Sequence, residues 1–195
     1  MDILVVNCGS SSLKADVLDS ENGHRRVRVR VQRIGQSDST AIINGGASIP
    51  LGAVDHAAAL AQMLPRILAI VDTIAAVGHR VVHGGEKFSA PTRIDDAVEV
   101  AIEELIPLAP LHNPANLAGI RAARALLPEV PHVAVFDTAF HSTLPRRARN
   151  YALPLELAQK NGIRRYGFHG PSHAWVASRA AEYMDADLRE LRIIT

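Results

Sequence analysis

Residues 3–14, ILVVNCGSSSLK, constrain the fold more than any other part of the chain. The first four are apolar and mostly β-branched, which predicts a short buried strand. Gly9 and three serines then predict a tight turn, and an apolar run from Leu13 to Leu18 predicts a returning strand. Such a turn offers backbone N–H groups and small hydroxyls to an oxyanion. The alternative is an ordinary polar hairpin turn, and this stretch alone does not decide between the two.

The remaining pattern predicts an α/β domain with a mixed sheet, because strands come first and then alternate with helices. Further strands are predicted at residues 25–34, 74–82 and 133–136, with a surface hairpin at 36–53 and a new strand beginning at 191–195. Helices are predicted at residues 54–71, 95–106, 113–126, 154–160 and 171–184. Pro65 predicts a kink or break near Leu64, and Asn113 is the expected cap of its helix.

Composition narrows the class of protein. The chain has 195 residues, 48% of them hydrophobic, so it can bury a sizeable core. Its net charge of +1 gives no electrostatic case for nucleic acid or an anionic membrane. Cys8 is the only cysteine, which excludes an internal disulfide and favours a packing role. The sequence shows no signal-peptide pattern and no apolar run long enough for a bilayer, so we expect a cytoplasmic protein.

Polar residues stand where predicted strands end or where a helix begins, as Asn7, Arg80, Asp137 and His112 do. Ligand sites of open α/β sheets collect at the carboxyl ends of strands. Arg80 interrupts an apolar strand, and its forked guanidinium suits a carboxylate or phosphate; a salt bridge with an acid such as Glu86 is the alternative. Asp137 could hold a metal, orient a nucleophile or simply cap a helix.

The nine histidines divide by their neighbours in the sequence. His112 and His169 lie in loops and could donate hydrogen bonds to developing phosphoryl charge, although a single loop histidine is usually a surface or packing residue. Four others are candidates for supporting roles because they lie next to motifs: His79, His83, His141 and His173. We expect only surface or packing roles for His24, His56 and His132. No HExxH or CxxC spacing occurs, which argues against a zinc site.

Five long motifs, in order, resemble those of the acetate kinase family. They are ILVVNCGSSSLK (3–14), VGHRVVHGGEKF (77–88), PLAPLHNPANL (107–117), VFDTAFH (135–141) and RRYGFHGPSH (164–173). The resemblance implies the ribonuclease-H-like fold shared by sugar kinases, actin and heat-shock ATPases, with nucleotide in the cleft between two domains. Residues 1–150 would then form most of the acyl-substrate domain, and 151–195 the beginning of a truncated nucleotide-binding domain.

The resemblance also implies a reaction and its co-substrates. Acetate kinases reversibly transfer the γ-phosphoryl group of ATP to acetate, giving acetyl phosphate and ADP with Mg²⁺ or Mn²⁺. Such a transfer needs positioning and charge neutralisation more than covalent catalysis. The resemblance places four residues of this chain around nucleotide and phosphate: Asn7, Ser10, Ser12 and Lys14. Asn7 would also hold Mg²⁺ together with a glutamate beyond residue 195.

The acceptor side is assigned by the same resemblance. Arg80 would bind the carboxylate or the acyl phosphate, and Asp137 would position the reacting groups or Mg²⁺. His169 would stabilise the equatorial oxygens of the phosphoryl group in flight, with help from His112. The acetate methyl group would lie in an apolar pocket formed by Val82, Leu111 and Phe168.

Length departs from the family pattern, because its members have about twice as many residues. We therefore expect an N-terminal portion of an acetate kinase, inactive alone, whose full-length parent is a homodimer. One alternative is a propionate or butyrate kinase, because one methylene in a small pocket is worth only ~1–3 kcal/mol. Another alternative is a non-catalytic fragment that binds a carboxylate or a partner chain.

Overall fold

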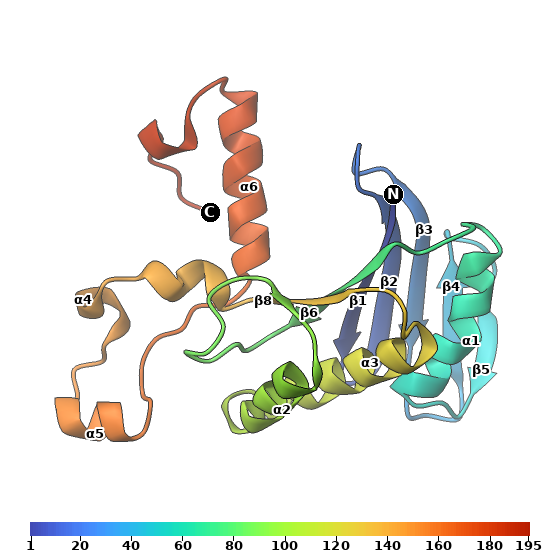
Figure 1. The fold of residues 1–195 in the computed structure, drawn as a ribbon, viewed down its shortest axis with the longest axis horizontal. Helices are drawn as coiled ribbons and strands as arrows, with labels where there is room; N and C mark the ends of the chain where they lie inside the picture. The colour runs from blue at the N-terminus through green and yellow to red at the C-terminus, as the bar shows by residue number, and fades with distance from the viewer. The chain divides into compact units, whose positions relative to one another are not determined.

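The computed structural model describes all of residues 1–195, and these form two compact units. Unit 1 comprises Met1–Val81 and Pro91–Val135, and unit 2 comprises Val82–Ala90 and Phe136–Thr195. One eight-stranded sheet runs in the order β5-β4-β3-β2-β1-β6-β8-β7 (Figure 1). Its strands are β1 (Asp2–Gly9), β2 (Ser12–Asp19), β3 (Arg25–Gln32), β4 (Ser39–Ile43), β5 (Ile49–Gly52), β6 (Ala76–Val81), β7 (Thr92–Arg93) and β8 (His132–Phe136).

The N-terminal hairpin forms as the sequence predicts. β1 and β2 pair antiparallel, with Gly9 opposite Ser12 across the turn, and β3 and β4 continue the antiparallel sheet. β1 also pairs parallel with β6, with Val6 opposite His79. The sheet is therefore mixed, which confirms the predicted α/β class.

Three helices belong to unit 1: α1 (His56–Leu68), α2 (Asp96–Glu104) and α3 (Asn113–Leu126). α1 and α3 pack on each other, α1 against β2 and α3 against β1 (Figure 1). α3 approaches β1 so closely that a Cβ on Gly119 would lie 2.4 Å from Sγ of Cys8. Cys8 is buried in this contact, and burial raises the pKa of its thiol to about 12, so Cys8 packs as a neutral side chain, as expected.

Two helix details differ from the prediction. α1 continues through Pro65 without a break, because Met63, Leu64 and Ile67 are buried around it and tertiary packing offsets the lost hydrogen bond. His112, not Asn113, stands at the N-cap of α3. Asn113 is the first helical residue and is fully buried, so its side chain packs inside the unit and does not cap the helix.

Unit 2 contains mostly short elements: the 3₁₀ turns η2 (Ala139–Thr143) and η3 (Leu188–Glu190), and the helices α4 (Arg146–Arg149), α5 (Leu155–Lys160) and α6 (Gly170–Tyr183). The prediction of a strand at residues 191–195 is wrong, because these residues form no strand. A strand persists only beside a partner with which it exchanges backbone hydrogen bonds. The two-residue strand β7 and the four-residue helix α4 are too short for a periodic pattern and were not predicted. No helix in the chain has the length and apolar character needed to cross a membrane.

Candidate active site

Asn7 and Arg80 lie next to each other at the ends of two parallel strands. Because Val6 pairs with His79 in the β1–β6 register, the next residues, Asn7 and Arg80, reach the same edge of the sheet. Nη1 of Arg80 lies 3.4 Å from Oδ1 of Asn7, the acceptor of its N–H. Both side chains are half-buried. The expected meeting of polar groups at a carboxyl strand edge is therefore present for this pair.

The predicted phosphate turn is a two-residue connection that is held from behind. Nε2–H of His56 donates to the carbonyl oxygen of Gly9 over 2.7 Å, and Nδ2–H of Asn116 donates to that of Cys8 over 2.7 Å. Ser10 and Lys14 are exposed. These contacts leave the outer side of the turn free for a ligand. No local sequence pattern pointed to His56 or Asn116, because their partners lie far away along the chain.

His112 and Leu111 lie in the loop that leads into α3. The side chain of His112 makes no capping hydrogen bond, although the residue occupies the N-cap position. Leu111 is 75% exposed, and His112 is exposed beside it. An exposed leucine next to an exposed histidine offers an apolar and a polar contact for a ligand.

Unit 2 brings Asp137 and His169 together. Oδ2 of Asp137 lies 3.8 Å from Nδ1 of His169. The Asp137 side chain is 2% exposed and that of His169 is 72% exposed, so a buried carboxylate lies behind an accessible ring. Thr138, and not Asp137, occupies the N-cap position of the 3₁₀ turn η2 that follows.

The loop that carries His169 is tightly constrained. His169 has a φ of +57°, a left-handed conformation that non-glycine residues rarely adopt, and it stands at the N-cap of α6. The N–H of Gly170 donates to the carbonyl oxygen of Asp137 over 2.9 Å. A Cβ on Gly170 would lie 2.5 Å from that same oxygen. Strain of this kind persists only where surrounding contacts enforce it, and it concentrates at functional sites.

His141 supports this loop from one side. Its Nε2–H donates to the carbonyl oxygen of Phe168 over 2.9 Å. Gly167, with a φ of +78°, lies against the same ring, and a Cβ there would come within 2.4 Å of it. The ring of His141 also meets that of His173 edge-on at 5.5 Å. His141 and His173, candidates for supporting roles, therefore both lie beside the loop that presents His169.

Two residues predicted for the acetate pocket belong to unit 2, Val82 and Phe168. Val82 is buried, whereas Phe168 is 44% exposed, with its ring 5.7 Å from that of His83. Burial lowers the pKa of His83, so this ring stays neutral near pH 7. Glu86, the acid suggested as a partner for Arg80, pairs with Arg164 at 2.5 Å. An ion pair of Arg80 with Glu86 thus competes with an existing one.

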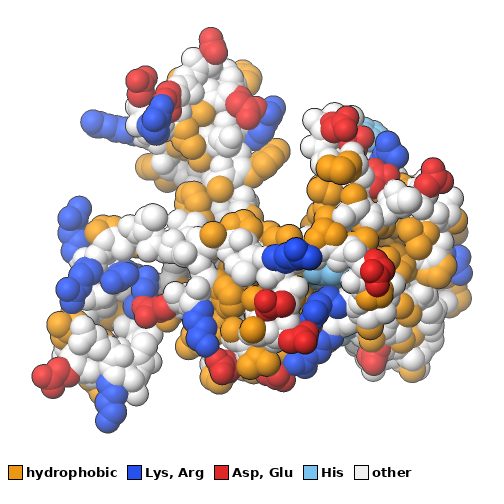
Figure 2. All heavy atoms as spheres, in the orientation of Figure 1, with side chains coloured by type: hydrophobic (Ala, Val, Ile, Leu, Met, Phe, Trp, Pro, Cys, Tyr) orange, Lys and Arg blue, Asp and Glu red, His pale blue; other side chains and the backbone are white.

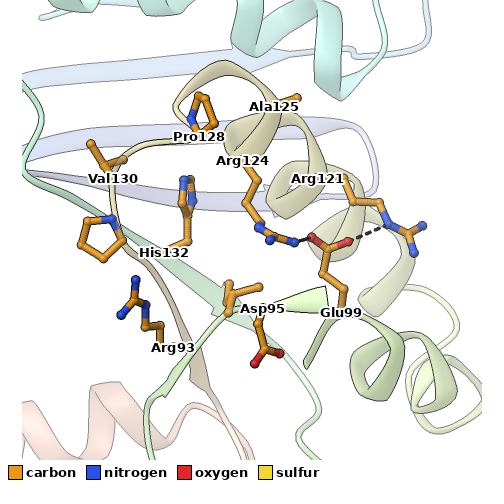
Figure 3. Close-up of a pocket in the computed structure, with 11 residues that line it drawn as sticks. Arg93, Asp95, Glu99, Arg121, Arg124, Ala125, Pro128, Val130 and His132 are labelled. Atoms are coloured by element: carbon orange, nitrogen blue, oxygen red, sulfur yellow. Dashed lines mark hydrogen bonds and ion pairs between the residues drawn. The ribbon is translucent and has the colours of Figure 1, made fainter. Parts of the chain in front are cut away.

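A cavity of about 740 Å³ opens elsewhere in unit 1 (Figure 3). Glu99 lies between Arg121 and Arg124 and pairs with both, as the dashed lines show. His132 also lines this cavity, but none of the predicted site residues does. Since these two arginines are already neutralised by acidic partners, the cavity offers an anion little net attraction.

The residues fit a metal ion that takes most of its ligands from a bound molecule and water better than an ion held by protein side chains alone. No group of three or more His, Cys, Asp or Glu side chains is assembled to hold a metal. Asn7 offers one amide oxygen, and Mg²⁺ commonly takes one or two protein oxygens while keeping waters and substrate phosphates. Asn7 therefore fits a metal ion whose other ligands are phosphate oxygens and water.

Comparison with known proteins decides the family. A sequence model of the Acetokinase family matches residues 2–195. This chain belongs to the acetokinase family. Over all of this chain it is 49% identical, in an alignment of 207 positions that includes gaps, to an acetate kinase of Clostridium botulinum (strain Okra / Type B1), of which it covers 52%. It is 51% identical over 93% of its length to an acetate kinase of Pseudomonas aeruginosa (strain LESB58), of which it covers 47%.

Solved structures confirm the acetokinase fold. The crystal structure of Porphyromonas gingivalis acetate kinase matches 96% of this chain with a TM-score of 0.88 at 42% identity. A propionate kinase from Francisella tularensis subsp. tularensis SCHU S4 matches 95% with a TM-score of 0.89 at 39% identity. The chain covers 50% of each. It thus spans about half the length of the relatives that it matches.

Proposed function

We propose that this chain is the acyl-substrate part of an acetate kinase, which transfers the γ-phosphoryl group of ATP to acetate and back. The activity belongs to the complete enzyme, by which we mean a protein of the relatives' length that contains these residues. The observation that carries the proposal is the pair of Arg80 and Asn7, 3.4 Å apart at the ends of parallel strands, in a member of this family. A guanidinium at a strand edge suits a carboxylate acceptor.

In unit 1, Arg80 binds the acetate carboxylate or the acyl phosphate. Asn7, Ser10, Ser12 and Lys14 contact the transferred phosphate, since they surround or follow the hairpin turn. Leu111 and His112 add an apolar contact and a hydrogen-bond donor from the exposed start of α3. A carboxylate is already a competent nucleophile, so these residues position and neutralise and no strong base is required.

In unit 2, His169 donates a hydrogen bond to the equatorial oxygens of the phosphoryl group. Its exposed ring and left-handed backbone support this role, because both present the side chain away from the protein. Asp137 lies behind the ring and orients it from 3.8 Å. Val82 and Phe168 complete the apolar contact with the acetate methyl group.

Nucleotide and metal complete the proposed reaction. Asn7 would offer one amide oxygen to a Mg²⁺ ion, which would supply neutralisation of the phosphate charge. The adenosine pocket and the glutamate that would hold Mg²⁺ together with Asn7 lie in the remainder of the complete enzyme. We further propose that this enzyme is a cytoplasmic homodimer with a domain boundary near residue 150, which analytical ultracentrifugation and limited proteolysis would test.

A propionate kinase is the second candidate, since a solved propionate kinase matches the fold with a TM-score of 0.89. A longer acyl chain changes binding by only ~1–3 kcal/mol per methylene. Relative kcat/KM values for acetate, propionate and butyrate in the complete enzyme decide between them. Acetate should be preferred, and a preference for propionate would replace the first proposal.

The 195-residue chain alone should lack acetate kinase activity. Transfer needs nucleotide, Mg²⁺ and acceptor aligned in one site, and losing that alignment returns up to ~7–11 kcal/mol to the barrier. The test is a coupled acetyl phosphate assay on the purified chain and on the complete enzyme, with mass spectrometry confirming each length. Turnover by the chain within tenfold of the complete enzyme would contradict the division of roles. Inactivity of both would favour the non-catalytic alternative.

A further inference from the structure

A second cavity, of about 360 Å³, lies entirely within unit 2. Its lining combines the short helix α4 with α5 and the loop that leads to Arg164. Three arginines line it, Arg146, Arg149 and Arg164, against a single acid, Glu86. The cavity therefore carries an excess of positive charge, and Figure 2 shows Lys and Arg side chains gathered around α4.

The guanidinium groups of Arg146 and Arg149 have no hydrogen-bond or ion-pair partner in the chain. This distinguishes the cavity from the larger one in unit 1, where Arg121 and Arg124 are neutralised by acidic side chains. Two like charges facing one cavity repel each other unless an anion lies between them. The unpaired arginines are therefore groups that a ligand could satisfy.

Arg164 supplies the third donor, and its contacts with Glu86 and Tyr166 hold its side chain in place in the cavity lining. Its side chain is only 12% exposed; Nη1 donates to Oε1 of Glu86 over 2.5 Å, and the guanidinium lies over the Tyr166 ring at 5.1 Å. Its Nε is buried and has no hydrogen-bond partner. Glu86 neutralises the charge of Arg164. The buried Nε–H of Arg164 and the guanidinium groups of Arg146 and Arg149 therefore remain without a partner. An orphaned buried donor normally has a partner, which a ligand can supply.

We propose that this cavity binds a small multivalent oxyanion, with Arg146 and Arg149 as the principal contacts and Nε–H of Arg164 as a buried donor. Planar guanidiniums recognise phosphate and carboxylate groups through paired N–H donors, so both chemistries share the required feature of several charged oxygens. A volume of about 360 Å³ accommodates an anion larger than a single phosphate. The site uses none of the residues assigned to phosphoryl transfer.

The test measures pyrophosphate and succinate binding to the 195-residue chain by isothermal titration calorimetry at low salt. All proteins carry Arg80→Ala, so that the candidate active site does not add to the signal. The double variant Arg146→Gln/Arg149→Gln should weaken binding at least tenfold. Arg147→Gln is the matched control, since Arg147 lies on the same helix, equally charged, but does not line the cavity. It should bind within about twofold of the parent.

Each outcome decides the proposal. Loss of binding confined to the double variant supports it, and the tighter of the two probes then identifies phosphate or carboxylate chemistry. Equal weakening by Arg147→Gln would show only diffuse attraction to a basic helix and would overturn the proposal. No saturable binding of either probe at millimolar concentration would also overturn it. Circular dichroism of each variant confirms folding, which these three partnerless side chains should not affect.

Discussion

Unit 1 and unit 2 hold their proposed functional residues in different ways. Arg80 lies on β6, inside a continuous sheet, and its neighbours His79 and Val81 are buried. His169 lies on a loop in a left-handed conformation and depends on a few local contacts. A strand residue is positioned by the whole sheet, whereas a loop residue is positioned by individual hydrogen bonds and close packing. The loop should therefore be more sensitive to single changes around it.

The two units also differ in how well they cover their apolar side chains. The largest fully buried side chains, apart from Phe136, all lie in unit 1. In unit 2, Trp175, Tyr183 and Ile194 are exposed, Tyr183 by 92%. Figure 2 shows hydrophobic side chains on the surface around α6. Unit 1 thus has a core of its own, whereas unit 2 leaves much of its apolar surface uncovered.

The largest expected effect is on backbone protection. Amides of β1, β2, β3 and β6 should exchange with deuterium about 10³-fold more slowly than those of α5 and α6, because buried, hydrogen-bonded strands open only when the core opens. Hydrogen exchange followed by mass spectrometry on the 195-residue chain measures this ratio. Similar protection in both units would show that unit 2 is as stable as unit 1 and would contradict the proposed difference between them.

Replacing Arg80 tests the sheet-held residue. In the complete enzyme, Arg80→Ala should lower kcat/KM by about 10³-fold and weaken acetate saturation, because a charge-assisted contact to the substrate is lost. Steady-state kinetics measure both parameters. Arg66→Ala, an exposed arginine in the last turn of α1, is the control and should change neither. Unchanged kcat/KM and acetate saturation in Arg80→Ala would show that Arg80 has only a structural role, in an ion pair.

Replacing His169 tests the loop-held residue. His169→Ala should lower kcat of the complete enzyme by ~10²-fold with little change in nucleotide binding, as for the loss of one donor to a developing oxyanion. Calorimetric binding of ATP and single-turnover kinetics separate the two effects. A large loss of ATP affinity at unchanged kcat would instead place His169 in nucleotide binding.

The buried histidine pair of unit 1 should make stability depend on pH. Nε2–H of His132 donates to the Leu127 carbonyl oxygen over 3.0 Å, so its Nδ1 is the acceptor for Nε2–H of His79, also over 3.0 Å. Burial, and then the charge of His132, lower the pKa of His79 from 6.5 to about 3. Below pH 6.5 the unfolded chain therefore binds more protons than the folded chain, and stability falls as the pH drops toward 3.

The size of this effect follows from the pKa shift. The pKa shift of His79 alone should lower the free energy of unfolding by about 2 kcal/mol when the pH drops from about 7 to 5. Urea unfolding of His79→Gln should show a shallower pH dependence than that of the parent chain. His24→Gln, which removes an exposed histidine outside the pair, should retain the parent's slope. An equally steep slope in His79→Gln would contradict the role of the pair.

The smallest expected effect concerns the support of the loop. His141→Leu should lower kcat of the complete enzyme about tenfold, because the Phe168 carbonyl loses its donor and His169 moves slightly. His141→Gln, which keeps an N–H in reach, should restore most of the rate. KM for ATP should stay unchanged in both. An equal loss of kcat in His141→Leu and His141→Gln would show that packing of the imidazole ring against Gly167, rather than the hydrogen bond, holds the loop.

The sequence predicted most of the fold and the candidate residues because those signals are local. Alternating Val27, Val29 and Val31 predicted β3, and all three are buried. The Gly/Ser run predicted the first hairpin turn, which the register of β1 and β2 confirms. Residues 191–195 misled because an apolar run indicates a strand without saying where its partner lies. The roles of Arg80 and His169 rest on the resemblance and stay predictions.

Most of the strands and helices, their buried faces and the five motifs can be predicted from the sequence, since each depends on residues close together in the chain. Which of these segments meet depends on the tertiary structure. It placed Asn7 beside Arg80, His56 behind Gly9 and His141 under Phe168. It also gave His169 its left-handed backbone. Those facts depend on strand pairing and close packing between distant segments, which no local period specifies.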